Sequence, residues 1–275
     1  MKKILVPTDF SDNAKQAVQY ALAFAKHSKQ SVHLVHAVAA SKKAGHFSGI
    51  ENLVLTEKQA ELHSVLTALK SNEAADVELT AAIQQDYVVD AIIKEADKVK
   101  ADLIIMGTEG ASGLEKWIVG STTNSLIKNT KLPVLAIPTQ QKTFAFSKVC
   151  LGLDLSKAVD VTPLQPLFDL CKIFNAQLDL VSVVTELKNA TVTIHSSLEE
   201  VLKAQKINYR AYQTVAKQSS EIDDAILLFA KDAKADVIAI LNQSNQRSWW
   251  QNLFHSSVSE EIAYQSTLPL LVLQS

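Results

Sequence analysis

The residues best suited to chemistry in this chain lie between positions 107 and 121. Gly107-Thr-Glu-Gly110 is followed nine residues later by Gly120-Ser121, and the apolar run Ala101–Met106 comes directly before it. That run is typical of a buried parallel strand. Glycines let a backbone approach an anion closely, and a helix beginning after Gly120 would offer unpaired N–H groups and the positive end of its dipole. The spacing therefore predicts a phosphate-binding loop.

This pattern differs from the two common phosphate-binding motifs. No Gly-Lys-Ser/Thr follows the first glycines, so the segment is not a P-loop. The last glycine comes far too late for the dinucleotide fingerprint GxGxxG. Ordinary turn glycines are the alternative, but their position between a buried strand and a helix favours a ligand. We expect a phosphorylated nucleotide held by a loop of unusual length.

The composition of the chain argues against several classes of function. The 275 residues are 47% hydrophobic, enough for one large domain or two ordinary ones, and the net charge of -2 argues against nucleic acid as the main partner. No apolar stretch is long enough to span a membrane, and the apolar run at the N-terminus is too short for a signal peptide. Cys150 and Cys171 lie in apolar segments, as expected of buried thiols in a reducing cytosol. We therefore expect a cytoplasmic protein.

The chain repeats itself over about half its length. Ala101-Asp-Leu-Ile-Ile recurs as Ala235-Asp-Val-Ile-Ala, and the Leu-Pro pair ending in Pro133 recurs at Pro269. Asp9-Phe-Ser also recurs as Asp154-Leu-Ser. This period is too long for a solenoid and fits two tandem domains. We place them at 1–139 and 147–275, joined by a polar stretch.

Strands and helices alternate along each half. In the first half we expect helices over Ser11–Lys29, Glu51–Leu69, Tyr87–Val99 and Ser121–Asn129, and strands over Lys3–Pro7, Ser31–Val38, Val77–Ile83, Ala101–Met106 and from Pro133. Such alternation predicts a Rossmann-like α/β fold, a parallel sheet with helices on both faces. Ligands bind such sheets beyond the carboxyl ends of the strands. Asp9 and Gly107 both stand at such ends.

Together these residues resemble the universal stress protein family, as a tandem member with two such domains. The family's ATP-binding pattern is G-x2-G-x9-G-S/T, and Gly107, Gly110, Gly120 and Ser121 fit it without a gap. The opening Val6–Ser11 is also family-like. The resemblance implies two tandem five-stranded parallel-sheet domains. It also implies pairing of each last strand with its equivalent, either between the two halves or in a homodimer.

The resemblance further implies which residues contact ATP. Pro7, Thr8 and Asp9 would lie near adenine and ribose, with Val38 closing the adenine pocket and Met106 beside the nucleoside. A carboxylate such as Asp9 accepts hydrogen bonds from ribose hydroxyls or the adenine amino group. The residues around the triphosphate, with or without Mg²⁺, would be Gly107, Gly110, Gly120, Ser121, Thr122 and Thr123, while Gly113 adds freedom to the loop.

The second half departs from this pattern at every glycine. Its equivalent stretch runs from Ile240 to Ser257 and contains no glycine. Asp154 remains, but Leu153 stands where Thr8 stands. We expect this half to have lost ATP binding; an altered site for another ligand is the alternative. The adjacent Trp249 and Trp250 are expected to plug a vacated pocket or cover an interface.

Catalysis has little support in the residues. Phosphoryl transfer needs charge stabilisation and a positioned nucleophile, yet the first-half loop offers only Lys116 and Glu109. The histidines show no metal-ligand spacing, and His33 and His36 are expected to point to different faces of one strand. The leading hypothesis is a nucleotide-dependent regulator read by an unidentified protein partner. A slow ATPase and a nucleotide-independent scaffold are the alternatives.

Overall fold

The computed structural model describes residues 1–38, 48–72, 74, 76–108, 120–141, 143–155, 158–184, 192–216, 222–242 and 268–275. The described residues divide into two compact units, one up to Leu132 and the other from Pro133 onward. Both units are α/β, with mostly parallel sheets and packed helices, as the sequence predicts. None of the described helices is both long and apolar enough to cross a lipid bilayer.

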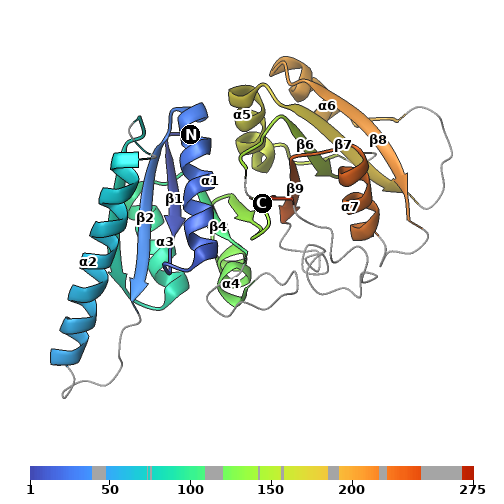
Figure 1. The fold of residues 1–275 in the computed structure, drawn as a ribbon. Coiled ribbons are helices and arrows are strands. Elements are labelled where there is room, and N and C mark those ends of the chain that lie inside the picture. Colours follow the sequence, from blue (N-terminus) through green and yellow to red (C-terminus); the bar gives the residue numbers. More distant parts are fainter. Residues whose placement is uncertain are drawn as a thin grey trace. The chain divides into compact units, whose positions relative to one another are not determined.

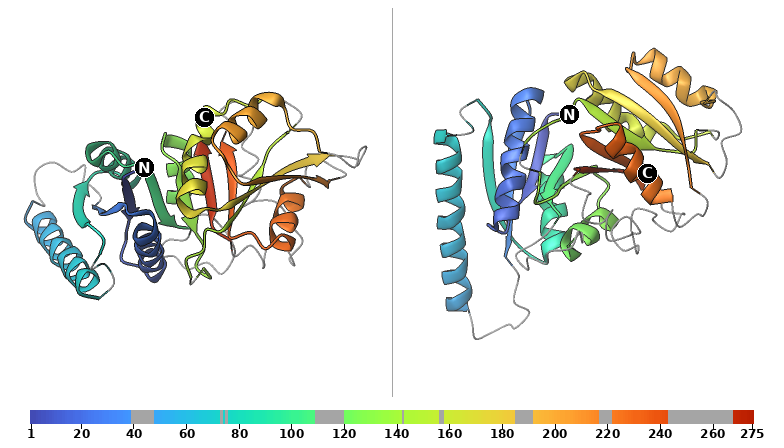
Figure 2. Two further views of the ribbon diagram at one scale, coloured as in Figure 1. Left: turned by 90° about the horizontal axis from the view of Figure 1, so that it is seen from above. Right: turned by 45° about the vertical axis from the view of Figure 1, so that its right-hand side comes forward.

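The first unit is a parallel sheet with the strand order β3-β2-β1-β4 (Figure 1). Its elements are β1 (Lys3–Pro7), α1 (Asp12–Ser28), β2 (Ser31–Val38), α2 (Ser48–Asn72), β3 (Leu79–Gln85), α3 (Val88–Val99), β4 (Leu103–Gly107) and α4 (Ser121–Asn129). Helices α1 and α2 lie on one face of the sheet and α3 on the other (Figure 2), where α3 packs against α4. The central strands β1 and β4 are buried on both faces.

Local sequence signals set the ends of these helices. Ser11 caps α1 by accepting a hydrogen bond from the Ala14 N–H at 3.2 Å, and Asp12 adds negative charge to the first turn. Lys29 and Lys100, just after α1 and α3, adopt the left-handed conformation that ends a helix. The chain then turns directly into the next strand.

The second unit has the strand order β5-β10-β9-β6-β7-β8. Its elements are β5 (Val134–Ile137), β6 (Lys148–Gly152), η1 (Thr162–Leu164), α5 (Gln165–Phe174), β7 (Gln177–Val184), α6 (Ser196–Ala204), β8 (Tyr209–Val215), α7 (Ile222–Asp232), β9 (Val237–Asn242) and β10 (Leu270–Gln274). Only β5 runs antiparallel to its described neighbour, pairing Leu135 with Leu271. This strand belongs to the first repeat in sequence but to the second compact unit, because it pairs with β10. The domain limits 1–139 and 147–275 stay a prediction about the repeat.

One backbone anchor occurs twice and shows how closely the repeats correspond. The Asp102 carboxylate accepts hydrogen bonds from the N–H groups of Lys2 and Lys3 at the start of β1. The Asp236 carboxylate does the same for Ser147 and Lys148 at the start of β6, at 2.7 and 2.9 Å. In each repeat the Asp follows the alanine that precedes a central strand.

We predict that Asp102→Ala and Asp236→Ala each lower the free energy of unfolding by about 1–3 kcal/mol, because each leaves two N–H groups without a charged acceptor. Chemical denaturation followed by circular dichroism measures the loss. The exposed Asp76→Ala serves as the control and should change little. A loss in only one of the two Asp variants would contradict the equivalence of the anchors.

Candidate functional site

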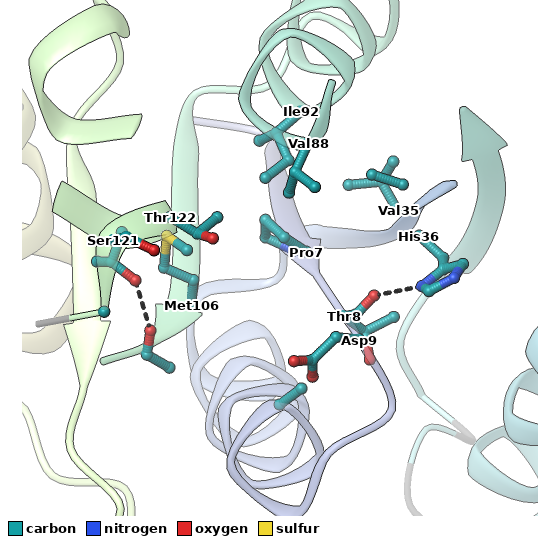
Figure 3. A pocket seen from close by; sticks show the side chains of 15 residues that line it. Pro7, Thr8, Asp9, Val35, His36, Val88, Ile92, Met106, Ser121 and Thr122 are labelled. Carbon is teal, nitrogen blue, oxygen red and sulfur yellow. Dashed lines mark hydrogen bonds between the residues drawn. The ribbon is translucent and has the colours of Figure 1, made fainter. Parts of the chain in front are cut away.

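A pocket of about 400 Å³ opens at the carboxyl ends of the strands in the first unit (Figure 3). It lies where β1 and β4 end and α4 begins, the position expected for a ligand in a parallel α/β sheet. Its volume falls in the range of small-molecule sites. The described lining residues are Pro7, Thr8, Asp9, Ala14, Val35, His36, Ala37, Val88, Ile92, Met106, Gly107, Gly120, Ser121, Thr122 and Thr123.

One end of the pocket is polar and built by the junction of β4 and α4. The Gly120 N–H donates to the Thr108 carbonyl at 2.6 Å, and the Thr123 hydroxyl donates to the Gly107 carbonyl at 3.0 Å. These two bonds hold the end of the strand against the start of the helix. Both glycines of the motif that lie within the described residues therefore face the same pocket.

The start of α4 can receive an anion. Gly120 is the N-cap, with φ -54° and ψ 153°, and as a glycine it has no side chain with which to cap the helix. The N–H groups of the first helical turn have no intrahelical acceptor, and the helix dipole adds partial positive charge there. Ser121 and Thr122 add hydroxyl groups at the same end. Such an end binds phosphate without a lysine.

Gly107 is required by its surroundings. A Cβ atom at this position would lie 2.6 Å from Nδ2 of Asn13, which is buried on α1. No side chain therefore fits at the end of β4 unless Asn13 moves. The backbone of β4 stays bare where it meets the pocket, which lets a ligand approach it closely.

The other end of the pocket is apolar with a carboxylate at its edge. Pro7 faces Val88 and Ile92 of α3 across the cavity, while Met106 lies beside Ser121 and Thr122 (Figure 3). Asp9 is oriented by Ser11, whose N–H donates to Asp9 Oδ1 at 3.0 Å and whose hydroxyl donates to the same oxygen. An apolar wall beside a fixed acceptor suits a flat heterocycle carrying hydroxyl or amino donors.

The structure brings together most residues that the sequence singled out. Those that line the pocket are Pro7, Thr8, Asp9, Met106, Gly107, Gly120, Ser121, Thr122 and Thr123. Val38 is not among the lining residues, whereas its neighbour Ala37 is. Gly110 and Gly113 lie outside the described residues, as do Glu109 and Lys116.

Several lining residues have no motif in the sequence. Val88 and Ile92 come from α3 and His36 from β2, far from the glycine segment. Apolar periodicity marks Ile92 as a buried helical position, but only the packing of α3 on the sheet places it at a ligand. His33 and His36 were expected on different faces, and their hydrogen-bond partners differ accordingly: Glu95 on α3 and the Thr8 carbonyl.

The second unit carries different residues at the equivalent positions. In the aligned registers Leu241 stands where Gly107 stands, and Gly152 stands where Pro7 stands. Ile226, the equivalent of Ile92, packs so closely on Gly152 that a Cβ there would lie 2.6 Å from its Cδ1 atom. The remaining segment, 243–267 with Trp249 and Trp250, lies outside the described residues.

Comparison with known proteins identifies the family. The model of the universal stress protein family matches residues 1–138, half of the chain. The chain belongs to the universal stress protein family. It is 34% identical over 146 residues to universal stress protein MJ0531 of Methanocaldococcus jannaschii, covering 51% of this chain and 84% of that protein. It is also 32% identical over 152 residues to universal stress protein MJ0577 of the same organism, covering 50% and 94%.

A solved structure shows the same fold over the whole chain. The crystal structure of a universal stress protein from Archaeoglobus fulgidus matches with a TM-score of 0.73, covering 99% of this chain and 98% of that one at 21% identity. Identity at this level supports the fold alone. The two-unit architecture is therefore found in another universal stress protein.

The two cysteines lie outside the pocket, and both are buried. Burial raises the pKa of both Cys150 and Cys171 to about 12, so these thiols stay protonated at neutral pH. Within the part of the chain that the structure describes, no three His, Cys, Asp or Glu residues gather as metal ligands would.

A buried polar network lies beneath α3 of this universal stress protein. His33 donates from Nε2 to Glu95 Oε1 at 2.9 Å, and its Nδ1 lies 2.7 Å from the Thr80 hydroxyl. Glu95 also accepts from Gln84 and from Lys98, the latter at 3.1 Å. Burial lowers the pKa of His33 from its ordinary 6.5, and Glu95 opposes this shift. The network joins α3 to β2 and β3.

We predict that His33 makes the first unit less stable in acid. The pKa of His33 is lower in the folded state, so the unfolded chain binds the proton first as the pH falls below 6.5. The contribution of His33 to the free energy of unfolding is therefore complete above that pH and is lost below it. His33→Gln should therefore flatten the fall in thermal midpoint between about pH 7 and about pH 5.5. The exposed His63→Gln is the control. An unchanged fall in the His33 variant would contradict the prediction.

Proposed function

We propose that this chain is a nucleotide-dependent regulator that binds one adenine nucleotide, ATP in the first instance, in the pocket of its first unit. The observation that carries the proposal is the joining of an uncapped helix start and a bare strand end with an apolar wall and a fixed carboxylate. Phosphates would lie at Gly107, Gly120 and Ser121, and the nucleoside between Pro7, Ile92 and Met106.

The family motif supports ATP as the ligand. Gly107, Gly120 and Ser121 are three of its four fixed positions, and all three line the pocket. Asp9 would accept from the ribose hydroxyls or the adenine amino group. If Mg²⁺ accompanies the triphosphate, Asp9 is the one carboxylate among the described lining residues.

The proposal assigns no ligand to the second unit. Leu241 places a side chain where Gly107 leaves the strand bare, and Ile226 packs against Gly152. Apolar side chains in these two places would exclude both a phosphate and a ring. We therefore expect one nucleotide per chain.

Regulation fits the site better than catalysis. Efficient phosphoryl transfer needs cations or arginine fingers on the transferred phosphate. The described residues that line the pocket include neither Lys nor Arg. Any ATP hydrolysis should therefore be slow, and the bound nucleotide would act by changing a surface that a partner protein recognises.

We predict that calorimetric titration of ATP gives one site per chain and that Gly120→Val abolishes it. A β-branched side chain at the helix start blocks the approach of phosphate but leaves α4 intact. The matched control is Ser125→Val, which places the same side chain later on α4, away from the lining residues. This control should bind ATP as the wild type does.

Other outcomes would each remove part of the proposal. Two sites per chain would assign a ligand to the second unit. Equal affinity in Gly120→Val would reject the phosphate end of the pocket. Absence of binding in the wild type would favour a nucleotide-independent scaffold, and turnover well above background would favour an ATPase.

A further inference from the structure

The loop between β1 and α1 contains a residue in a strained conformation. Phe10 has a φ of 65°, in the left-handed region. A bulky side chain seldom adopts this conformation, because its Cβ atom crowds the backbone there. Such strain persists only where the surroundings enforce it, and it is concentrated at functional sites. Phe10 directly follows Asp9, the carboxylate at the pocket edge.

Three contacts hold Phe10 in place. Its N–H donates to the Thr8 hydroxyl at 3.1 Å. Its ring packs on the His36 ring, with the centroids 4.5 Å apart. The Lys58 ammonium group of α2 lies 5.2 Å from the ring centroid, within cation–π range. The aromatic side chain thus contacts both β2 and α2.

His36 also holds the residue on the other side of Asp9. Its Nδ1 lies 2.7 Å from the Thr8 carbonyl oxygen, as the dashed line in Figure 3 shows. A carbonyl oxygen only accepts, so Nδ1 carries the hydrogen atom. His36 is only 9% exposed, and it lies on β2, which is fixed in the sheet. One imidazole therefore bonds Thr8 and packs on Phe10, and Asp9 lies between them.

The second unit lacks this arrangement. At the register of His36 it has Ser182, and at the position of Phe10 it has Leu155. Leu155 is not in the left-handed region, and its N–H donates to the Ser182 hydroxyl at 3.4 Å. The strained residue therefore occurs in the unit that keeps the glycine motif, whereas Leu155, at the equivalent position of the other unit, is not strained.

We propose that His36 is a positioning residue for ligand binding. By bonding the Thr8 carbonyl and packing on Phe10, it keeps the β1–α1 loop strained and the Asp9 carboxylate turned to the ligand. The loop is then shaped before the ligand arrives, so binding does not have to order it. This inference rests on the proposed function, because it needs a nucleotide that contacts Asp9.

A double-mutant cycle tests the inference. The affinity for ATP is measured by calorimetry in the wild type, Asp9→Asn, His36→Leu and the double variant. Loss of the charged acceptor should weaken binding about 10- to 100-fold. If His36 acts through Asp9, His36→Leu weakens binding as well, and the double variant is no weaker than Asp9→Asn alone. Losses that multiply would show independent action and overturn the inference.

A second pair of variants guards against a folding defect in His36→Leu. His36→Asn can place an N–H donor near the position of Nδ1, whereas His36→Gln places it farther out, near Nε2. We expect Asn to bind ATP more tightly than Gln at equal thermal midpoints. Equal affinity in the two, or wild-type affinity in both, overturns the inference. If the wild type itself binds no ATP, the proposed function fails, and the inference fails with it.

Discussion

The site depends on the closure between the end of β4 and the start of α4. Two hydrogen bonds, from the Gly120 N–H to Thr108 and from the Thr123 hydroxyl to Gly107, bring a bare strand end and an uncapped helix start into one pocket. Both glycines are needed, because a Cβ at position 107 would clash with Asn13 and a side chain at position 120 would lie where an anion approaches the helix start. The apolar wall and Asp9 can contribute to ligand binding only when the junction of β4 and α4 has formed.

The two repeats share the hydrogen bonds of their scaffold but differ in the residues at the pocket position. The anchors at Asp102 and Asp236 correspond bond for bond, and so do the bonds from the N–H of residues 8 and 153 to the carbonyls of β2 and β7, both at 2.9 Å. The pocket residues differ: Gly107 becomes Leu241 and His36 becomes Ser182. A parallel α/β sheet keeps its backbone bonds while the residues at its carboxyl edge change.

Much of the fold could be predicted from the sequence, because each strand and helix is marked by its own apolar period. Strand β1 and helix α4 have the predicted limits, whereas α2 extends beyond the predicted Glu51–Leu69 to Ser48–Asn72. Residue patterns alone do not reveal the antiparallel pairing of β5 with β10, which depends on contacts distant in sequence. That pairing follows from the family resemblance.

The pocket residues that belong to one short segment of sequence could be predicted. Those that the packing of distant elements brings to the pocket could not. The glycines and Asp9 form local motifs, so they could be named. Ile92 and His36 reach the pocket through the packing of α3 and the register of β2. The left-handed conformation of Phe10 has no signal in the sequence, since glycine or asparagine would be expected there.

The central claim, one nucleotide held by the first unit, is tested most directly by hydrogen exchange of the full chain with and without ATP. The account predicts slower exchange in the first unit over residues 7–14, 103–108 and 120–126. No change is expected in the equivalent segments of the second unit, 151–155 and 237–242. Slower exchange in the second unit, or none in either unit at saturating ATP, would contradict the account.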